Sequence, residues 1–157
     1  MDLYVWIKLL HILSATVLFG TGIGTAFFML QAHLSGNREA MRVTTQHVVL
    51  ADALFTTPAV SVQLATGVWL SLRLQIPWGS AWFLAVLGLF LLVGLCWLPV
   101  VWIQLRIRDI LAAGGGYPEY RHLMRAWIAL GVPGFLGVLL LFYLMVSRAG
   151  MAWIILG

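Results

Sequence analysis

Charged residues are scarce in this sequence, and their scarcity excludes most classes of protein. Only 9% of the 157 residues are Asp, Glu, Lys or Arg, whereas 62% are hydrophobic. A soluble domain carries about 25% charged residues, so we expect no soluble domain here. The net charge of +4 does not indicate nucleic-acid binding, because the basic residues stand at the ends of apolar segments, where they meet lipid head groups and set orientation. We exclude nucleic acid as a partner and predict a lipid bilayer instead.

The sequence has little cysteine, and its first residues lack the pattern expected of a cleavable leader. Cys96 is the only cysteine, which excludes an intrachain disulfide and a cysteine-based metal site and leaves a packing role. The first six residues, Met1 to Trp6, contain no positive charge, and no small-residue cleavage site follows at the usual distance. We therefore expect the first apolar segment to be a retained helix and not a signal peptide.

Four long stretches contain no Asp, Glu, Lys or Arg, namely 9–37, 53–72, 74–105 and 126–147. A helix needs roughly 20 apolar residues to cross the hydrocarbon core of a bilayer, so each stretch is long enough. The sequence therefore predicts an all-α integral membrane four-helix bundle, one domain over 1–157. Its spans are expected at about 4–31, 53–72, 81–105 and 126–148.

The start of the second span has two interpretations. Residues 40–54 form a helical segment, and Thr56-Thr57-Pro58 is typical of a helix start, with a threonine cap before a proline in the first turn. Either Pro58 kinks one long helix, or a separate surface helix ends before it.

Small residues in the first span predict a packing face. Gly20 and Gly24 are four residues apart and therefore lie on one side of a helix, where a neighbouring backbone can approach closely. We expect this face to pack on another helix.

The positions of Lys and Arg predict the orientation in the membrane. Six arginines lie near the links 32–43 and 106–125, whereas the other side has Lys8, Arg73 and Arg148. Because positive residues concentrate on the cytoplasmic side, we predict that both termini lie outside the cytoplasm of a bacterial inner membrane.

His11 is the leading candidate for chemistry. It lies two turns inside the first span, where a polar side chain is costly to bury and usually has a partner. A stripe at helical spacing brings Ala15, Leu18, Gly22 and Thr25 to its side, and a flat macrocycle or another helix could lie there. The alternative is a neutral histidine hydrogen-bonded to a neighbouring carbonyl.

The other polar residues have simpler interpretations. His33, His47 and His122 lie toward the more basic end and are expected to contact solvent or phosphate. For straight antiparallel spans, His47 would be roughly 25 Å from His11 at the helical rise, so the two should not ligate one haem iron within a chain. Asp52 is the one acid near an apolar span and is expected either to relay protons or to pair at the interface.

Several short motifs resemble a known group of bacterial membrane proteins. They are Trp6 to Ser14, Phe55 to Ala59 with Thr66 to Leu70, the span starting at Trp82, Tyr120-Arg121, and Val132-Pro133 leading to Arg148. Together they resemble the four-helix proteins that include the HemJ-type protoporphyrinogen oxidases and the CopD-type copper-resistance domains. Within that group the chain is most similar to an uncharacterised subfamily of predicted integral membrane proteins.

The resemblance implies a cofactor site. In HemJ-type proteins the first-span histidine is linked to haem b and the basic residue ending the last span to activity, so these roles would fall on His11, as metal ligand, and on Arg148. The pattern also departs from the oxidases, because Leu130-Gly131-Val132 replaces an Asn-Glu before the last proline, and Arg148 replaces a lysine. The missing acid argues against the same oxidase reaction, whereas a haem or porphyrin site remains compatible with the motifs.

Two hypotheses about function follow. In the first, the protein holds haem b or a porphyrin through His11 and passes electrons to a quinone; its second axial ligand would come from a neighbouring subunit, or the iron would be five-coordinate. In the second, it is a non-catalytic membrane accessory subunit or a small permease. Both hypotheses include a homo-oligomer or membership of a larger membrane complex.

Overall fold

The computed structural model describes residues 2–114 and 116–156, with side chains as far as Ser147. The described chain is helical, and its elements are α1 (Leu3–Leu34), α2 (Arg38–Ala51), the π-helical turn η1 (Asp52–Thr56), α3 (Thr57–Arg73), α4 (Ala81–Ala112) and α5 (Tyr117–Leu156). By length and apolar composition, four helical paths could each cross a membrane: α1, the continuous path α2–η1–α3, α4 and α5. This confirms the all-α, four-span architecture.

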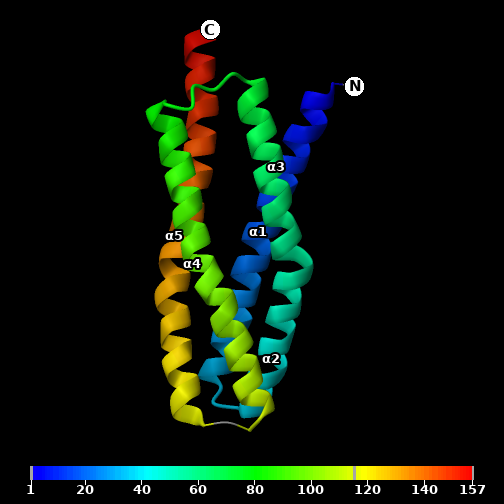
Figure 1. The fold of residues 1–157 in the computed structure, drawn as a ribbon, viewed down its shortest axis with the longest axis vertical. Helices are drawn as coiled ribbons and strands as arrows, with labels where there is room; N and C mark the ends of the chain where they lie inside the picture. Colours follow the sequence, from blue (N-terminus) through cyan, green and yellow to red (C-terminus); the bar gives the residue numbers. More distant parts are fainter. Residues whose placement is uncertain (1, 115, 157) are drawn as a thin grey trace.

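The helices form two antiparallel pairs. In Figure 1, α1 lies beside α3 and α4 lies beside α5, and α2 packs against both α1 and α4. The termini and the α3–α4 link lie at one end of the bundle, which we call the terminal end. The α1–α2 and α4–α5 links lie at the opposite end, which we call the link end.

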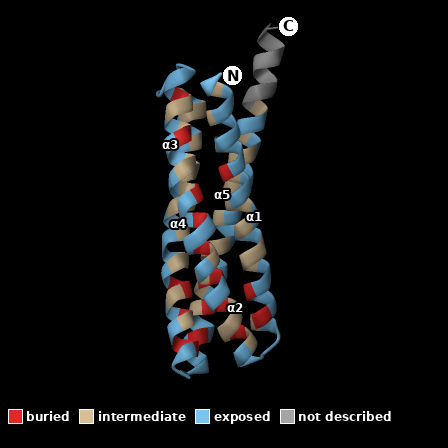
Figure 2. Ribbon diagram, turned by 90° about the vertical axis from the view of Figure 1, so that its right-hand side faces the viewer, coloured by how far each residue is buried: buried red, intermediate tan, exposed pale blue. Residues whose placement is uncertain are grey.

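The buried core lies toward the link end, where α2 joins the two pairs. One cluster of buried residues draws on α1, α2, α4 and α5: Met29, Ala32, Met41, Val48, Ile103, Ile107, Leu111, Tyr120, Met124 and Trp127. Nearer the middle, Phe19 of α1 contacts the rings of Phe135 and Phe142 on α5, with centroids 5.6 and 5.5 Å away. Elsewhere large apolar side chains cover the outside of the helices, which Figure 2 shows as mostly exposed. Such an outer surface suits contact with lipid.

The second span is one continuous helical path, so of the two interpretations the single long helix is correct. Thr56 has helical backbone angles and makes no capping hydrogen bond, so the predicted threonine cap is wrong. The Thr57 N–H instead bonds the Asp52 carbonyl, five residues back. This wider turn accommodates Pro58, which has no N–H to give to the helix.

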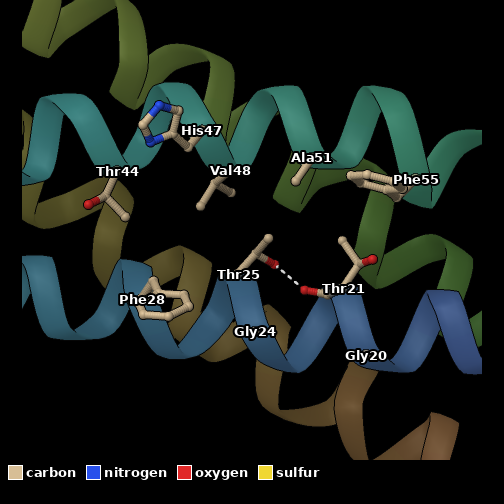
Figure 3. A pocket seen from close by; sticks show the side chains of 10 residues that line it. All are labelled: Gly20, Thr21, Gly24, Thr25, Phe28, Thr44, His47, Val48, Ala51 and Phe55. Carbon is tan, nitrogen blue, oxygen red and sulfur yellow. Dashed lines mark hydrogen bonds between the residues drawn. The ribbon is translucent and has the colours of Figure 1, made fainter.

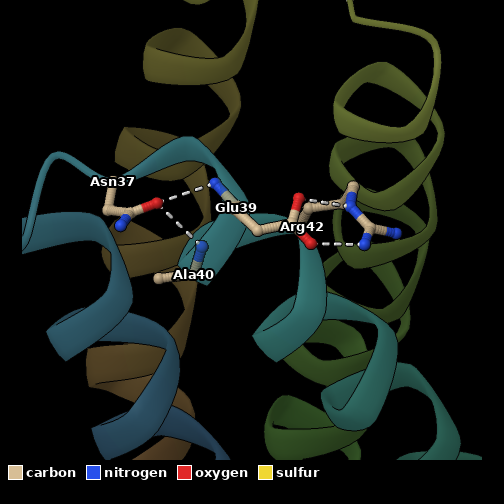
Figure 4. Close-up of polar contacts among 4 residues, drawn as sticks. All are labelled: Asn37, Glu39, Ala40 and Arg42. Atoms are coloured by element: carbon tan, nitrogen blue, oxygen red, sulfur yellow. Dashed lines mark hydrogen bonds and ion pairs between the residues drawn. The ribbon is translucent and has the colours of Figure 1, made fainter.

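A true helix start lies at Asn37, after the charged turn between the first two helices. The Asn37 side-chain oxygen accepts hydrogen bonds from the backbone N–H groups of Glu39 and Ala40 at 2.9 and 3.1 Å (Figure 4). Glu39 in turn pairs with Arg42 one turn later (Figure 4). These contacts satisfy backbone donors that α2 leaves free and place exposed charges at the link end.

Candidate functional site

The first site is a polar network around His11, between α1 and α3. The Nδ1 atom of His11 lies 2.8 Å from the Thr66 hydroxyl, and its Nε2 atom lies 3.0 Å from the Gln63 side-chain nitrogen. Ser14, one turn along α1, donates to the Gln63 side-chain oxygen at 2.5 Å. Both ring nitrogens of this half-buried histidine therefore have partners on the neighbouring helix.

The donors and acceptors around His11 indicate one tautomer when the Gln63 amide oxygen accepts from Ser14. The Thr66 hydroxyl donates its proton to the Val62 carbonyl at 2.6 Å, so it accepts the proton on Nδ1. The Gln63 amide N–H donates to Nε2, which therefore carries a lone pair. This arrangement corresponds to a neutral His11 with its proton on Nδ1 and its free electron pair directed at Gln63.

Gly67 makes room for the imidazole. A Cβ at this position would lie 3.3 Å from the His11 Cε1 atom, which is closer than a comfortable van der Waals contact. The glycine therefore lets α3 approach the histidine ring, one turn away from Gln63. The expected alternative of a hydrogen-bonded neutral histidine is close to what is seen, except that the partners are side chains and not a backbone carbonyl.

A groove of about 460 Å³ lies between α1 and the α2–η1 path, away from His11. Gly20, Thr21, Gly24, Thr25 and Phe28 line it from α1, and Thr44, His47, Val48, Ala51 and Phe55 line it from the α2–η1 path (Figure 3). Of the stripe predicted beside His11, Thr25 lines this groove, but His11 itself does not. The stripe therefore does not gather into one pocket with the histidine.

The Gly20–Gly24 face is open within the chain. A Cβ at either glycine would meet nothing within 4 Å, so no helix of the described chain packs closely on this face. That the face packs on a helix of another chain stays a prediction. The two helices separate here enough to leave the groove, and the glycines form part of its wall (Figure 3).

A second polar group lies inside the bundle at the π-helical turn. Asp52 is buried, and its Oδ1 atom accepts a hydrogen bond from the Thr56 hydroxyl at 2.7 Å. The side-chain amide of Gln104, on α4, lies near this carboxyl. The Gln104 Oε1 atom is itself buried and has no donor.

The comparisons with known proteins agree with this architecture. The family model of DUF2269, described as a predicted integral membrane protein, matches residues 5–149. The chain belongs to the DUF2269 family. No curated protein and no solved structure matches it.

The other three histidines of the DUF2269 chain are not part of the His11 network. His33 bonds the buried Tyr120 hydroxyl through Nδ1 at 2.9 Å, and His122 is exposed on α5. His47 opens onto the groove. The Arg148 side chain lies outside the described residues. Within residues 2–114 and 116–147, no three His, Cys, Asp or Glu side chains gather into a site for a metal ion.

Cys96 has the packing role expected of it. The thiol is free and buried, and the Cys96 Cβ atom would lie 3.4 Å from a Cβ at Gly134 on α5. The cysteine therefore belongs to the contact surface between α4 and α5.

Sequence reasoning missed three partners of the polar sites. Gln63 was not singled out, although it is the one amide in the middle of the second span. Thr66 was noticed only as part of a motif. Gln104 falls at the end of the predicted span 81–105, but it lies inside the bundle. In each case the useful signal was a polar side chain within a helix long and apolar enough to span a membrane.

Proposed function

We propose that this DUF2269 protein binds haem b or a porphyrin at His11 and exchanges electrons with a quinone. The observation that carries the proposal is the tautomer of His11. A histidine that binds iron through Nε2 needs a lone pair there and usually donates its other ring N–H to a neighbour. The contacts of His11 match this pattern, with Gln63 at Nε2 and Thr66 at Nδ1.

The Nε2 atom of His11 would become accessible to such a ligand if one side chain moved. Gln63 covers the Nε2 lone pair with its amide, so this flexible side chain would have to rotate away. Thr66 would keep the imidazole oriented, because its own proton is committed to the Val62 carbonyl. Haem, when bound, would supply one-electron chemistry, and the helices would supply orientation and a dry environment.

The remaining features of the proposal come from the resemblance to HemJ-type and CopD-type proteins. Arg148 would pair with a propionate from the end of the fourth span, as a cation does with a carboxylate. The second axial ligand would come from a neighbouring subunit of a homo-oligomer, or the iron would be five-coordinate. We propose a bacterial inner membrane as the location, with both termini outside the cytoplasm.

An absorption spectrum tests the proposal. The full chain is purified in mild detergent from haem-replete cells, and we expect a Soret band and reducible visible bands. His11→Ala should abolish the pigment, whereas His33→Ala and His122→Ala should leave it nearly unchanged. Arg148→Ala should reduce it less severely than His11→Ala.

Gln63→Ala sharpens this test, because it uncovers Nε2 without removing the proposed ligand. We expect pigment to be retained or increased in this variant. A wild-type protein that is folded and colourless contradicts the proposal, as does a His11→Ala variant that keeps full pigment. Loss of pigment in His47→Ala alone would place the site on the groove instead.

The second candidate function is a non-catalytic membrane accessory subunit or a small permease. The open Gly20–Gly24 face favours it, since a helix of another protein could pack closely there. In that case the hydrogen bonds of His11 join α1 to α3 and do nothing more. A colourless protein that co-purifies with other membrane proteins, and loses them in Gly20→Leu, would support this candidate.

A further inference from the structure

Asp52 is an isolated acid inside a bundle of membrane-spanning helices. The sequence has five acidic side chains, and Asp52 is the buried one, whereas Asp2, Glu39, Asp109 and Glu119 are exposed. All four of those exposed acids accept a hydrogen bond or form an ion pair. Asp52 therefore occupies an environment that no other carboxyl of the described chain shares.

Among the side chains that the structure describes, no cation forms an ion pair with Asp52. The ion pairs of the described residues involve other acids. The Asp52 carboxyl accepts a hydrogen bond from the neutral side chain of Thr56, and the neutral amide of Gln104 lies near it. His47 lies five residues earlier and opens onto the groove. An ionised carboxylate without a counter-ion is strongly disfavoured in such a place, so the group is expected to be neutralised.

The titratable groups on the surrounding helices are engaged elsewhere or exposed. On α1, His11 bonds Gln63 and Thr66, and His33 bonds Tyr120. On α4, Arg106 pairs with Glu119 and Arg108 with Asp109. On the second span, Arg42 pairs with Glu39, and Arg73 is exposed at the far end of α3.

Gln104 has a buried oxygen that could accept the proton of a neutral Asp52 side chain. Its Oε1 atom is a buried acceptor without a donor, and only 3% of the residue is exposed. A buried acceptor without a partner is uncommon in folded proteins. Rotation of the terminal amide exchanges its oxygen and nitrogen, so the oxygen can face the carboxyl that the amide already neighbours.

The π-helical turn brings Asp52 and Thr56 together. Asp52 and Thr56 are four residues apart and both buried, and the Thr56 hydroxyl donates to Asp52 Oδ1. The Asp52 carbonyl accepts from both the backbone N–H and the hydroxyl of Thr57. Such turns are frequent at functional sites, because they widen the helix at one point.

We propose that Asp52, Thr56 and Gln104 form a proton-binding site within the membrane-spanning region. Asp52 holds the proton as a neutral carboxylic acid and donates it to the Gln104 side-chain carbonyl, while its other oxygen accepts from Thr56. The ligand is a proton, and the site gives the protein a place to take up or release one inside the bundle. This inference is independent of whether His11 binds haem.

Infrared spectroscopy tests the site directly on the full chain in lipid nanodiscs. At neutral pH we expect the C=O band of one protonated carboxyl per chain, with a downshift in heavy water because the proton exchanges. Asp52→Asn should remove the band, and the matched control Asp109→Asn should keep it. Gln104→Leu should shift the band, because the acceptor of the carboxyl proton is gone.

If Asp52→Asn does not fold, the band can still be assigned by replacing the other acids in the wild-type background. The other acidic side chains are exposed and can be replaced one at a time, so a band that survives all of these substitutions belongs to Asp52. Absence of the band at neutral pH overturns the proposal. So does its loss when sodium chloride replaces choline chloride at constant pH, which would identify a sodium ion as the ligand.

Discussion

The His11 imidazole lies against Gly67, so close that a Cβ at that position would come within 3.3 Å of the His11 Cε1 atom. The same ring is fixed from both of its nitrogens by Thr66 and Gln63. The ring therefore has little room to move away from a larger side chain at position 67. The contact between α1 and α3 depends on a glycine at the one position where a histidine fills the space.

Gly67→Ala should destabilise the protein. The added methyl group must push the imidazole away and lengthen its hydrogen bonds, and overpacking of this kind typically costs about 1–3 kcal/mol. Thermal unfolding in detergent measures the effect. Gly88→Ala is the matched control, because a Cβ there meets nothing within 4 Å, and we expect it to be neutral or slightly stabilising.

Combining Gly67→Ala with His11→Ala tests whether contact with His11 causes the loss of stability. In a His11→Ala background the space beside Gly67 is empty, so Gly67→Ala should no longer be destabilising. Equal costs in both backgrounds would contradict the proposed contact.

Gly137→Ala should weaken the contact between α4 and α5. A Cβ at Gly137 would lie 2.7 Å from the Val93 Cγ2 atom, which is a clash, and we expect a loss of about 1–3 kcal/mol in unfolding free energy. Gly131→Ala on the same helix meets nothing within 4 Å and should cost little. Adding Val93→Ala to Gly137→Ala should restore much of the stability; failure to do so would show that the clash lies elsewhere.

The overall fold follows from the sequence because spans are a matter of length and polarity. Stretches without charge, such as 74–105, predicted helices long enough to cross a bilayer, and α4 contains the span 81–105 that was predicted within this stretch. The π-helical turn was not predicted, because Thr56-Thr57-Pro58 has the composition of a helix start. Only the packed neighbours show that Thr56 turns its hydroxyl inward to Asp52 instead of capping.

The candidate site was predictable in part. The cost of burying a polar group singled out His11 and Asp52, and both have partners. Their partners on other helices, Gln63 and Gln104, depend on the register between helices, which no local pattern encodes. The same holds for the open Gly20–Gly24 face. The spacing of the glycines indicates that small residues share one face of the helix, but it does not indicate what packs on that face.

Tyr120→Phe should remove the hydrogen bond between Tyr120 and His33. The phenol is almost fully buried, and its oxygen lies 2.9 Å from His33 Nδ1, so we expect a loss of about 0.5–1.5 kcal/mol. Tyr143→Phe is the control, because that ring is exposed. Equal effects of the two substitutions on unfolding would show that the bond contributes nothing.

The orientation of the bundle can be measured independently of any cofactor. Figure 1 brings the α1–α2 and α4–α5 links to one end of the bundle, and arginines concentrate near those links, whereas Lys8, Arg73 and Arg148 lie toward the other end of the spans. We therefore expect reporters at positions 37 and 115 to behave as cytoplasmic, and reporters at position 77 and at the C-terminus as external. Replacing Arg38, Arg42, Arg121 and Arg125 by Gln should weaken this preference and give mixed reporter signals. The reverse pattern in the wild type would place His11 in the cytoplasmic half of the membrane, and a proposed Arg148–propionate pair would then lie on the cytoplasmic side as well.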